Sequence, residues 1–139
     1  MQQHPYLRAY MAGITVPTGF LIVAMTAFTL ARYVLNVPID LERVIVFPMA
    51  VVPNAWGLWN IIWQASGRRI PIGVFGAILP VPLVCGAFVL ARLVAFTIPA
   101  PHILPFFFPI AVAIYYLAWK YLVAALNRIV GLVTPSASR

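Results

Sequence analysis

The sequence predicts an all-α integral membrane protein built as a four-helix up-down bundle, and three observations support this fold class. Of the 139 residues, 64% are hydrophobic and 8% are charged, whereas about a quarter of the residues in a soluble domain are charged. The apolar residues form four runs of roughly the 20 residues that a helix needs to cross a bilayer. In addition, a segment in the first half of the sequence matches a segment in the second half residue by residue. This composition excludes a water-soluble globule and a disordered chain.

The four expected spans are continuous apolar segments, at residues 12–35, 44–63, 72–98 and 104–126. Because the links between them are short, consecutive helices must pack antiparallel. The first apolar stretch is longer than the core of a secretory signal peptide, and we therefore interpret it as a retained helix. We expect a single membrane domain over residues 1–139, with no separate soluble domain.

Prolines interrupt the second and third expected spans. Pro48 and Pro53 lie in the second span, and Pro80 and Pro82 lie near the middle of the third. Each proline removes a backbone hydrogen bond and predicts a kink or a break in its helix. Such breaks are common at transport sites, and they are also tolerated in ordinary membrane helices.

Lys and Arg are distributed unequally between the two sides of this topology. Six of the nine lie on the side of the termini, and three lie on the other side together with both acids. Because cytoplasmic segments carry the excess of Lys and Arg, we expect both termini in the cytoplasm and a bacterial-type inner or plasma membrane. The net charge of +7 is too scattered for a nucleic-acid-binding face, so anionic lipid headgroups are the expected partners.

An internal repeat relates the first half of the chain to the second. At an offset of 60 residues, segment 27–34 matches segment 87–94 at six of eight positions. At an offset of 61, segment 47–51 matches segment 108–112 at four of five positions. The matches include an Arg and a Pro, both uncommon within spans. We therefore predict a duplicated two-helix hairpin, a parallel repeat whose copies are residues 8–63 and 68–126.

Arg32 and Arg92 occupy equivalent positions in the two predicted repeats. A charge in the hydrocarbon core is costly and marks a candidate functional site. Arg32 lies close to the end of its span, where a long side chain can reach the interface, whereas Arg92 lies deeper. Each arginine is either an interfacial anchor or part of a site for an anion or a lipid headgroup. We favour the anchor for Arg32, whereas for Arg92 the two interpretations are equally good.

A polar and aromatic face of the second span is the other candidate site. Trp56, Asn60 and Trp63 recur at helical spacing, and Asn54 lies nearer the middle of the span. One interpretation is a pocket lined by Asn54, Trp56 and Asn60, which binds a polar ligand through hydrogen bonds and ring stacking. The other is a belt of interfacial tryptophans that includes Trp59 and Trp63, with Asn60 bonded to a neighbouring helix.

The segment 53–57, followed by Gln64, resembles in its spacing a segment of the last helix of the SWEET sugar transporters. The resemblance is confined to this part of the second span. Those transporters are built from triple-helix repeats, whereas this chain repeats a pair of helices. The resemblance therefore adds weight to Asn54 and implies no shared fold.

Enzymatic chemistry has little support in the sequence. Asp40 and Glu42 share a short loop, and two carboxylates alone do not make an acid–base pair. The two histidines, His4 and His102, lie outside the spans, and Cys85 is the single cysteine. No metal-binding spacing results from these residues. We therefore expect no catalytic residue, no metal and no cofactor.

We expect a non-catalytic multi-pass protein that acts as an oligomeric, accessory or scaffold subunit of a membrane complex. Small residues four apart, such as Ala27 and Ala31, favour close helix contacts within or between subunits. The alternative is a carrier or channel for a small polar or anionic solute or a lipid headgroup, using Arg92, Asn54 and the proline-broken helices. A quinone- or lipid-binding enzyme subunit is a third possibility that the aromatic residues allow.

Overall fold

The structure is a computed structural model that describes residues 4–38, 41–93 and 104–132, and for 41–50, 90 and 104 it describes the backbone alone. The elements in these ranges are helical, as the sequence predicts. They are α1 (Pro5–Tyr33), α2 (Leu41–Ala65), α3 (Ile72–Ile78), α4 (Pro80–Leu93), α5 (Leu104–Leu117), the π-helix η2 (Ala118–Val123) and α6 (Ala124–Ile129).

Three helical stretches are long and apolar enough to cross a membrane. They are Pro5–Tyr33, Ile72–Leu93 and Pro105–Ile129, and they contain most of the first, third and fourth expected spans. The second expected span lies within α2, which is 25 residues long. The end of the third expected span and the link that follows it, 94–103, lie outside the described residues.

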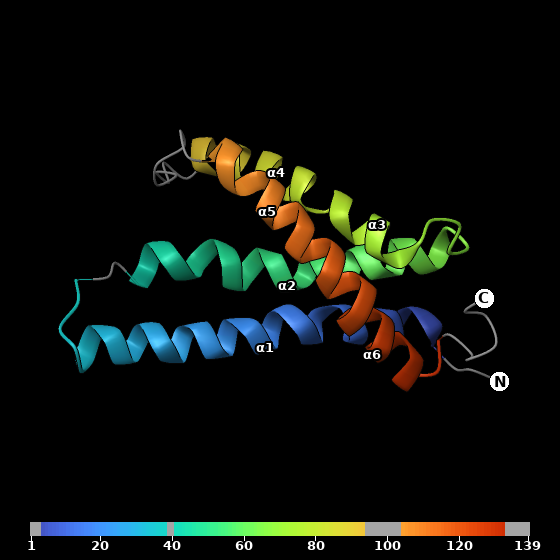
Figure 1. Ribbon diagram of the computed structural model, residues 1–139, viewed down its shortest axis with the longest axis horizontal. Coiled ribbons are helices and arrows are strands. Elements are labelled where there is room, and N and C mark those ends of the chain that lie inside the picture. Colours follow the sequence, from blue (N-terminus) through green and yellow to red (C-terminus); the bar gives the residue numbers. More distant parts are fainter. Residues whose placement is uncertain (1–3, 39–40, 94–103, 133–139) are drawn as a thin grey trace.

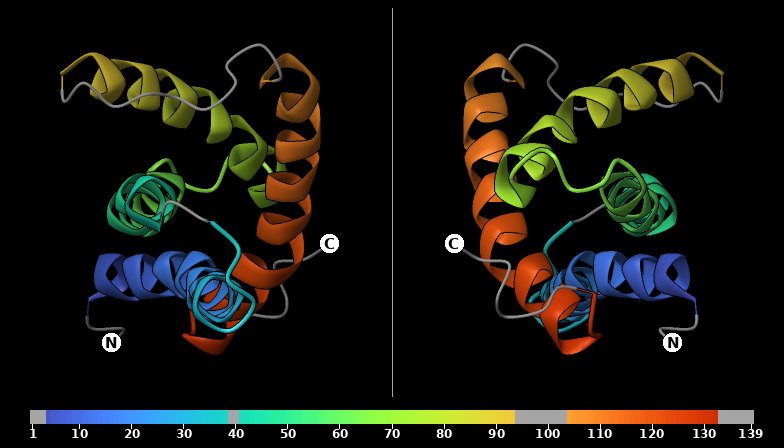
Figure 2. Two further views of the ribbon diagram at one scale, coloured as in Figure 1. Left: turned by 90° about the vertical axis from the view of Figure 1, so that its left-hand side faces the viewer. Right: turned by 90° about the vertical axis from the view of Figure 1, so that its right-hand side faces the viewer.

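The two halves of the chain cross each other. Helices α1 and α2 form an antiparallel hairpin and lie side by side (Figure 1). From the end of α2, helices α3 and α4 run back along the hairpin, and α5, η2 and α6 return obliquely to the start of α1 (Figure 1). Figure 2 shows α5, η2 and α6 closing one side of the molecule, from the level of α4 to the level of α1.

Proline interrupts the helix in the third expected span but not in the second. Helix α3 ends at Ile78 and α4 begins at Pro80, because a proline ring lacks the amide hydrogen and clashes with the preceding turn. The amide of Leu79 donates instead to the carbonyl of Gly76 at 3.1 Å, in a tighter turn. By contrast, α2 continues as one helix through Pro48 and Pro53.

The core lies where the oblique helices pack against the hairpin. It consists of buried side chains from three elements: Trp56 and Trp63 of α2, Phe75 of α3, Leu79 after it, and Trp119 and Val123 of η2. Trp56 and Trp119 pack ring against ring, with centroids 5.4 Å apart. Because lipid tails are as apolar as these side chains, close packing rather than exclusion from water stabilises such a core in a membrane.

Two glycines permit the close helix contacts around this core. A Cβ on Gly13 of α1 would lie 2.6 Å from the carbonyl oxygen of Trp56 and 2.8 Å from the Cα of Gly57. A Cβ on Gly76 of α3 would overlap the indole of Trp119, which is fully buried. The π-helical turn of η2 widens the helix at this point, so Trp119 packs directly onto the Gly76 backbone.

We predict that Gly76→Val destabilises the fold, whereas Gly86→Val does not. Gly86 lies in α4, and a Cβ there would meet nothing within 4 Å, so this variant controls for the change in helix propensity. Displacement of Trp119 by the added side chain should lower the free energy of unfolding by about 1–3 kcal/mol. Titration with a denaturing detergent, followed by circular dichroism, measures both variants. Equal stability of the two would contradict this packing.

Candidate functional site

The buried polar side chains in the described part of the chain are those of Asn60 in α2 and Asn127 in α6, which are 0% and 1% exposed. Asn60 Nδ2 donates to Asn127 Oδ1 at 2.8 Å and to the carbonyl of Ala9 at 2.7 Å. Asn127 Nδ2 donates back to Asn60 Oδ1 at 3.1 Å. We call these three groups the amide layer. It joins α1, α2 and α6 through polar groups that lipid cannot satisfy.

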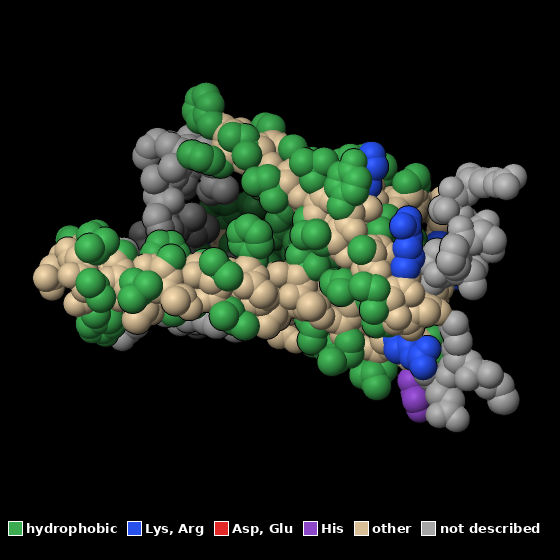
Figure 3. Space-filling model, turned by 60° about the horizontal axis from the view of Figure 1, so that its bottom comes forward, with side chains coloured by type: hydrophobic (Ala, Val, Ile, Leu, Met, Phe, Trp, Pro, Cys, Tyr) green, Lys and Arg blue, Asp and Glu red, His purple; other side chains and the backbone are tan. Residues whose placement is uncertain are grey.

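Two arginines bind the backbone where α6 ends. Arg8 Nη1 donates to the carbonyl of Val130 at 3.4 Å, and Arg68 Nη1 donates to the carbonyl of Leu132 at 3.0 Å. Carbonyls at a helix C-terminus lack helical partners and carry partial negative charge, so the cations neutralise this end. On the face shown in Figure 3, Lys and Arg side chains gather at one end, and hydrophobic side chains cover much of the rest.

Two other tryptophans of α2 donate hydrogen bonds to the backbone, one to α3 and one to the segment that connects α2 with α3. Trp63 Nε1 donates to the carbonyl of Ile70 at 2.9 Å, and Trp59 Nε1 donates to the carbonyl of Phe75 at 2.8 Å. Trp63 is 6% exposed, and Trp59 is half-buried. Both indoles therefore hold α2 against α3 and the segment before it, and their position at the membrane interface stays a prediction.

The structure separates the three residues that the sequence grouped as a polar pocket. Asn60 belongs to the amide layer. Asn54 is exposed on α2, and its Oδ1 accepts a hydrogen bond from the hydroxyl of Tyr10 in α1. Trp56 is buried and lines a different, apolar pocket. Sequence reasoning missed Asn127 because this residue lies just beyond the expected end of the last span, whereas the helix continues to Ile129.

Arg32 and Arg92 lie in the last turns of α1 and α4, at the end of the molecule opposite the amide layer (Figure 1). Both are exposed. The guanidinium of Arg32 lies 5.9 Å from the ring centroid of Tyr33. The structure therefore brings neither arginine to Asn54 or to the amide layer.

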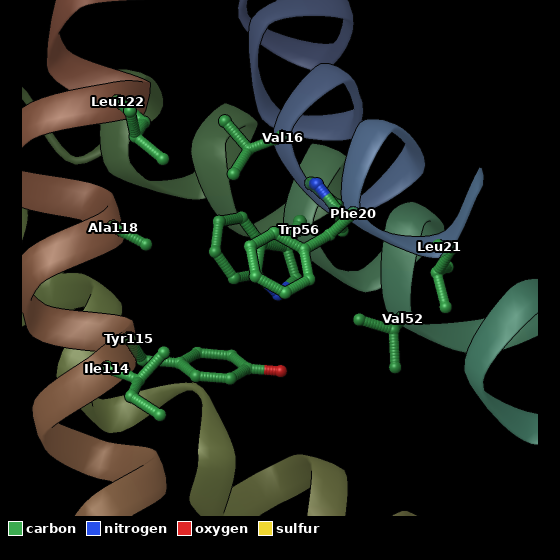
Figure 4. A pocket seen from close by; sticks show the side chains of 10 residues that line it. Val16, Phe20, Leu21, Val52, Trp56, Ile114, Tyr115, Ala118 and Leu122 are labelled. Atoms are coloured by element: carbon green, nitrogen blue, oxygen red, sulfur yellow. The ribbon is translucent and has the colours of Figure 1, made fainter. Parts of the chain in front are cut away.

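The pocket beside Trp56 has a volume of about 210 Å³ and opens between the hairpin and the returning helices. We call it the Trp56 pocket. Ten residues line it: Val16, Pro17, Phe20, Leu21, Val52, Trp56, Ile114, Tyr115, Ala118 and Leu122. Apart from the indole N–H of Trp56 and the hydroxyl of Tyr115, the lining side chains are hydrocarbon (Figure 4).

The described residues contain no group of three or more His, Cys, Asp or Glu that could hold a metal ion. No family model, curated protein or solved structure matches this chain. Functional conclusions therefore depend on the chemistry of the chain itself.

We predict that Asn60 and Asn127 act as one unit. In Asn60→Ala or Asn127→Ala, the remaining amide is buried without its partner, and each variant should lower the free energy of unfolding by about 1–2 kcal/mol. The double variant should lose less than the sum, with a coupling energy of about 0.6–2 kcal/mol. A double-mutant cycle in detergent unfolding measures this coupling.

Asn54→Ala is the matched control for this cycle, because Asn54 is an exposed asparagine on the same helix. It should cost less than either core substitution and should be additive with Asn127→Ala. Additive losses at Asn60 and Asn127 would contradict a shared amide layer.

Proposed function

We propose that this protein is a non-catalytic multi-pass membrane protein. It serves as an accessory or scaffold subunit, either in an oligomer of its own copies or within a larger membrane complex. The observation that carries the proposal is the uncovered outer half of α1. Phe20, Val23 and Leu30 are 75%, 70% and 53% exposed, and only 6% of the most apolar window of α1 is buried. Beyond the crossing point, this helix packs chiefly on α2, which leaves room for a helix of another subunit.

The use of the interior polar groups supports a structural role. The amides of Asn60 and Asn127 bind each other, and the indoles of Trp59 and Trp63 bind backbone carbonyls. These groups are thus occupied in holding helices together rather than in lining a polar path. A carrier or channel that uses Arg92 and Asn54 has less support, because both side chains are exposed on the outside of the fold.

The proposed topology has four spans, formed by α1, α2, α3 with α4, and α5 with η2 and α6. Two contacts favour the duplicated hairpin. Arg8 and Arg68, which coincide at the repeat offset of 60 residues, both bind carbonyls after α6. Gly13 and Gly73 coincide at the same offset, and both lie against a neighbouring helix.

We further propose that the end of the molecule carrying these arginines faces the cytoplasm of a bacterial-type inner or plasma membrane. Both termini would then be cytoplasmic, since α1 starts and α6 ends there (Figure 1). The argument is the excess of Lys and Arg on that side, where the basic side chains would meet anionic lipid headgroups.

Crosslinking in native membranes tests the subunit role. A benzophenone amino acid at Val23 should form adducts with a second copy or with one partner of defined mass, because this position faces out of the fold. The same probe at Val123, which is 0% exposed, should give no intermolecular adduct. The proposal fails if the protein is strictly monomeric in mild detergent and in nanodiscs and if Val23 captures lipid alone.

A further inference from the structure

The Trp56 pocket lies where α1, α2, α5 and η2 meet, and two of the side chains that line this otherwise apolar space, Trp56 and Tyr115, carry a hydrogen-bond donor. The indole N–H of Trp56 is buried and has no acceptor with hydrogen-bond geometry, although the Tyr115 hydroxyl lies close enough to interact with it. The phenol of Tyr115 points from α5 into the same space, beneath the Trp56 ring (Figure 4). The two ring centroids are 5.0 Å apart.

A buried donor without an acceptor is costly, and more so in a membrane, where water does not satisfy it. An indole can only donate, and a phenol can donate as well as accept. Two donors that converge in an apolar pocket therefore select a ligand that offers an oxygen acceptor, such as a carbonyl. The ten residues that line the pocket include no charged side chain to neutralise a charged ligand.

The size of the pocket limits the ligand. Its volume is about 210 Å³, which is larger than the cavity of about 150 Å³ that holds benzene in an engineered protein. A substituted six-membered ring fits this space, with Trp56, Tyr115 and Phe20 as aromatic walls. The pocket is only partly enclosed, so an apolar tail attached to the ring can extend into the lipid.

The depth of the pocket limits the source of the ligand. The midpoint of the span Pro5–Tyr33 falls at Gly19, and the lining residues of α1 run from Val16 to Leu21, within about 5 Å of it at a rise of 1.5 Å per residue. The ester carbonyls of bilayer lipids lie at the edge of the hydrocarbon core, roughly 15 Å from its centre. This place along α1 favours a ligand that dissolves in the hydrocarbon core itself.

We propose that the Trp56 pocket binds a lipid-soluble ligand with a carbonyl-bearing ring, of the chemical class of the membrane quinones. One ring carbonyl accepts hydrogen bonds from Trp56 Nε1 and the Tyr115 hydroxyl, and the ring packs against the aromatic walls. The site goes beyond the proposed subunit role, because it assigns the protein a small-molecule ligand whether or not the chain has a protein partner.

Indole resonances of the full chain, labelled with ¹⁵N-tryptophan and placed in nanodiscs, give a direct readout. The four tryptophans give four N–H signals, and a Trp56→Phe sample identifies the signal of Trp56. Decylbenzoquinone should shift this signal saturably and in the direction of a stronger hydrogen bond. The signal of Trp119, whose N–H is also buried without an acceptor but does not line the pocket, should stay in place.

Matched variants test the two donors and the space. Tyr115→Phe should weaken the apparent affinity about fivefold, which corresponds to the loss of one neutral hydrogen bond. Tyr116→Phe is its control, because Tyr116 lies beside Lys120 and not in the pocket, and it should bind normally. Ala118→Leu fills the pocket and should abolish the shift, and circular dichroism verifies that the variant is folded.

Two further probes distinguish the alternatives. Decylbenzene has the ring and tail without a carbonyl, and ethyl decanoate carries an ester carbonyl without a ring. The proposal is supported if neither shifts the Trp56 signal at concentrations where decylbenzoquinone saturates it. It is overturned if decylbenzene shifts the signal equally, if ethyl decanoate binds as well as the quinone, or if Tyr115→Phe and Tyr116→Phe bind decylbenzoquinone with the same affinity.

Discussion

The rest of the structure depends on the hydrogen bonds of the amide layer. In a bilayer the amides of Asn60 and Asn127 have no water to bind, so each must find a protein partner, and each finds the other together with the carbonyl of Ala9. This requirement holds the end of α6 against α1 and α2. With α6 in place, Arg8 and Arg68 reach the carbonyls that follow it.

The oblique crossing of α5, η2 and α6 over the α1–α2 hairpin explains why the molecule is tightly packed at one end and open at the other. Near the amide layer, Gly13 brings the backbones of α1 and α2 together, and Gly76 lets the Trp119 indole pack onto α3, where η2 widens to accommodate that indole. Towards the opposite end the helices diverge (Figure 2), and the apolar faces of α1 are exposed. The Trp56 pocket lies between these two regions, which is the physical reason that it is partly open and still contains a buried donor.

The candidate site was only partly predictable. Helical spacing correctly places Trp56, Asn60 and Trp63 on one buried face of α2. It could not show that Asn60 pairs with Asn127, since the two residues are 67 positions apart and the second lies past the expected end of its span. Asn54 and Trp56 are two residues apart in the sequence, yet one is exposed and the other is buried, because a helix turns them to different neighbours.

The sequence by itself determined the helical class and the apolar stretches long enough to cross a membrane. These properties follow from composition and from local backbone chemistry, which act within a few residues of the chain. The tertiary structure alone decided which polar groups pair, which tryptophans are satisfied and where a cavity remains. Those outcomes depend on how α5, η2 and α6 cross the hairpin. The crossing angle of two helices is set by how their side chains interdigitate, and here those side chains are distant in the sequence.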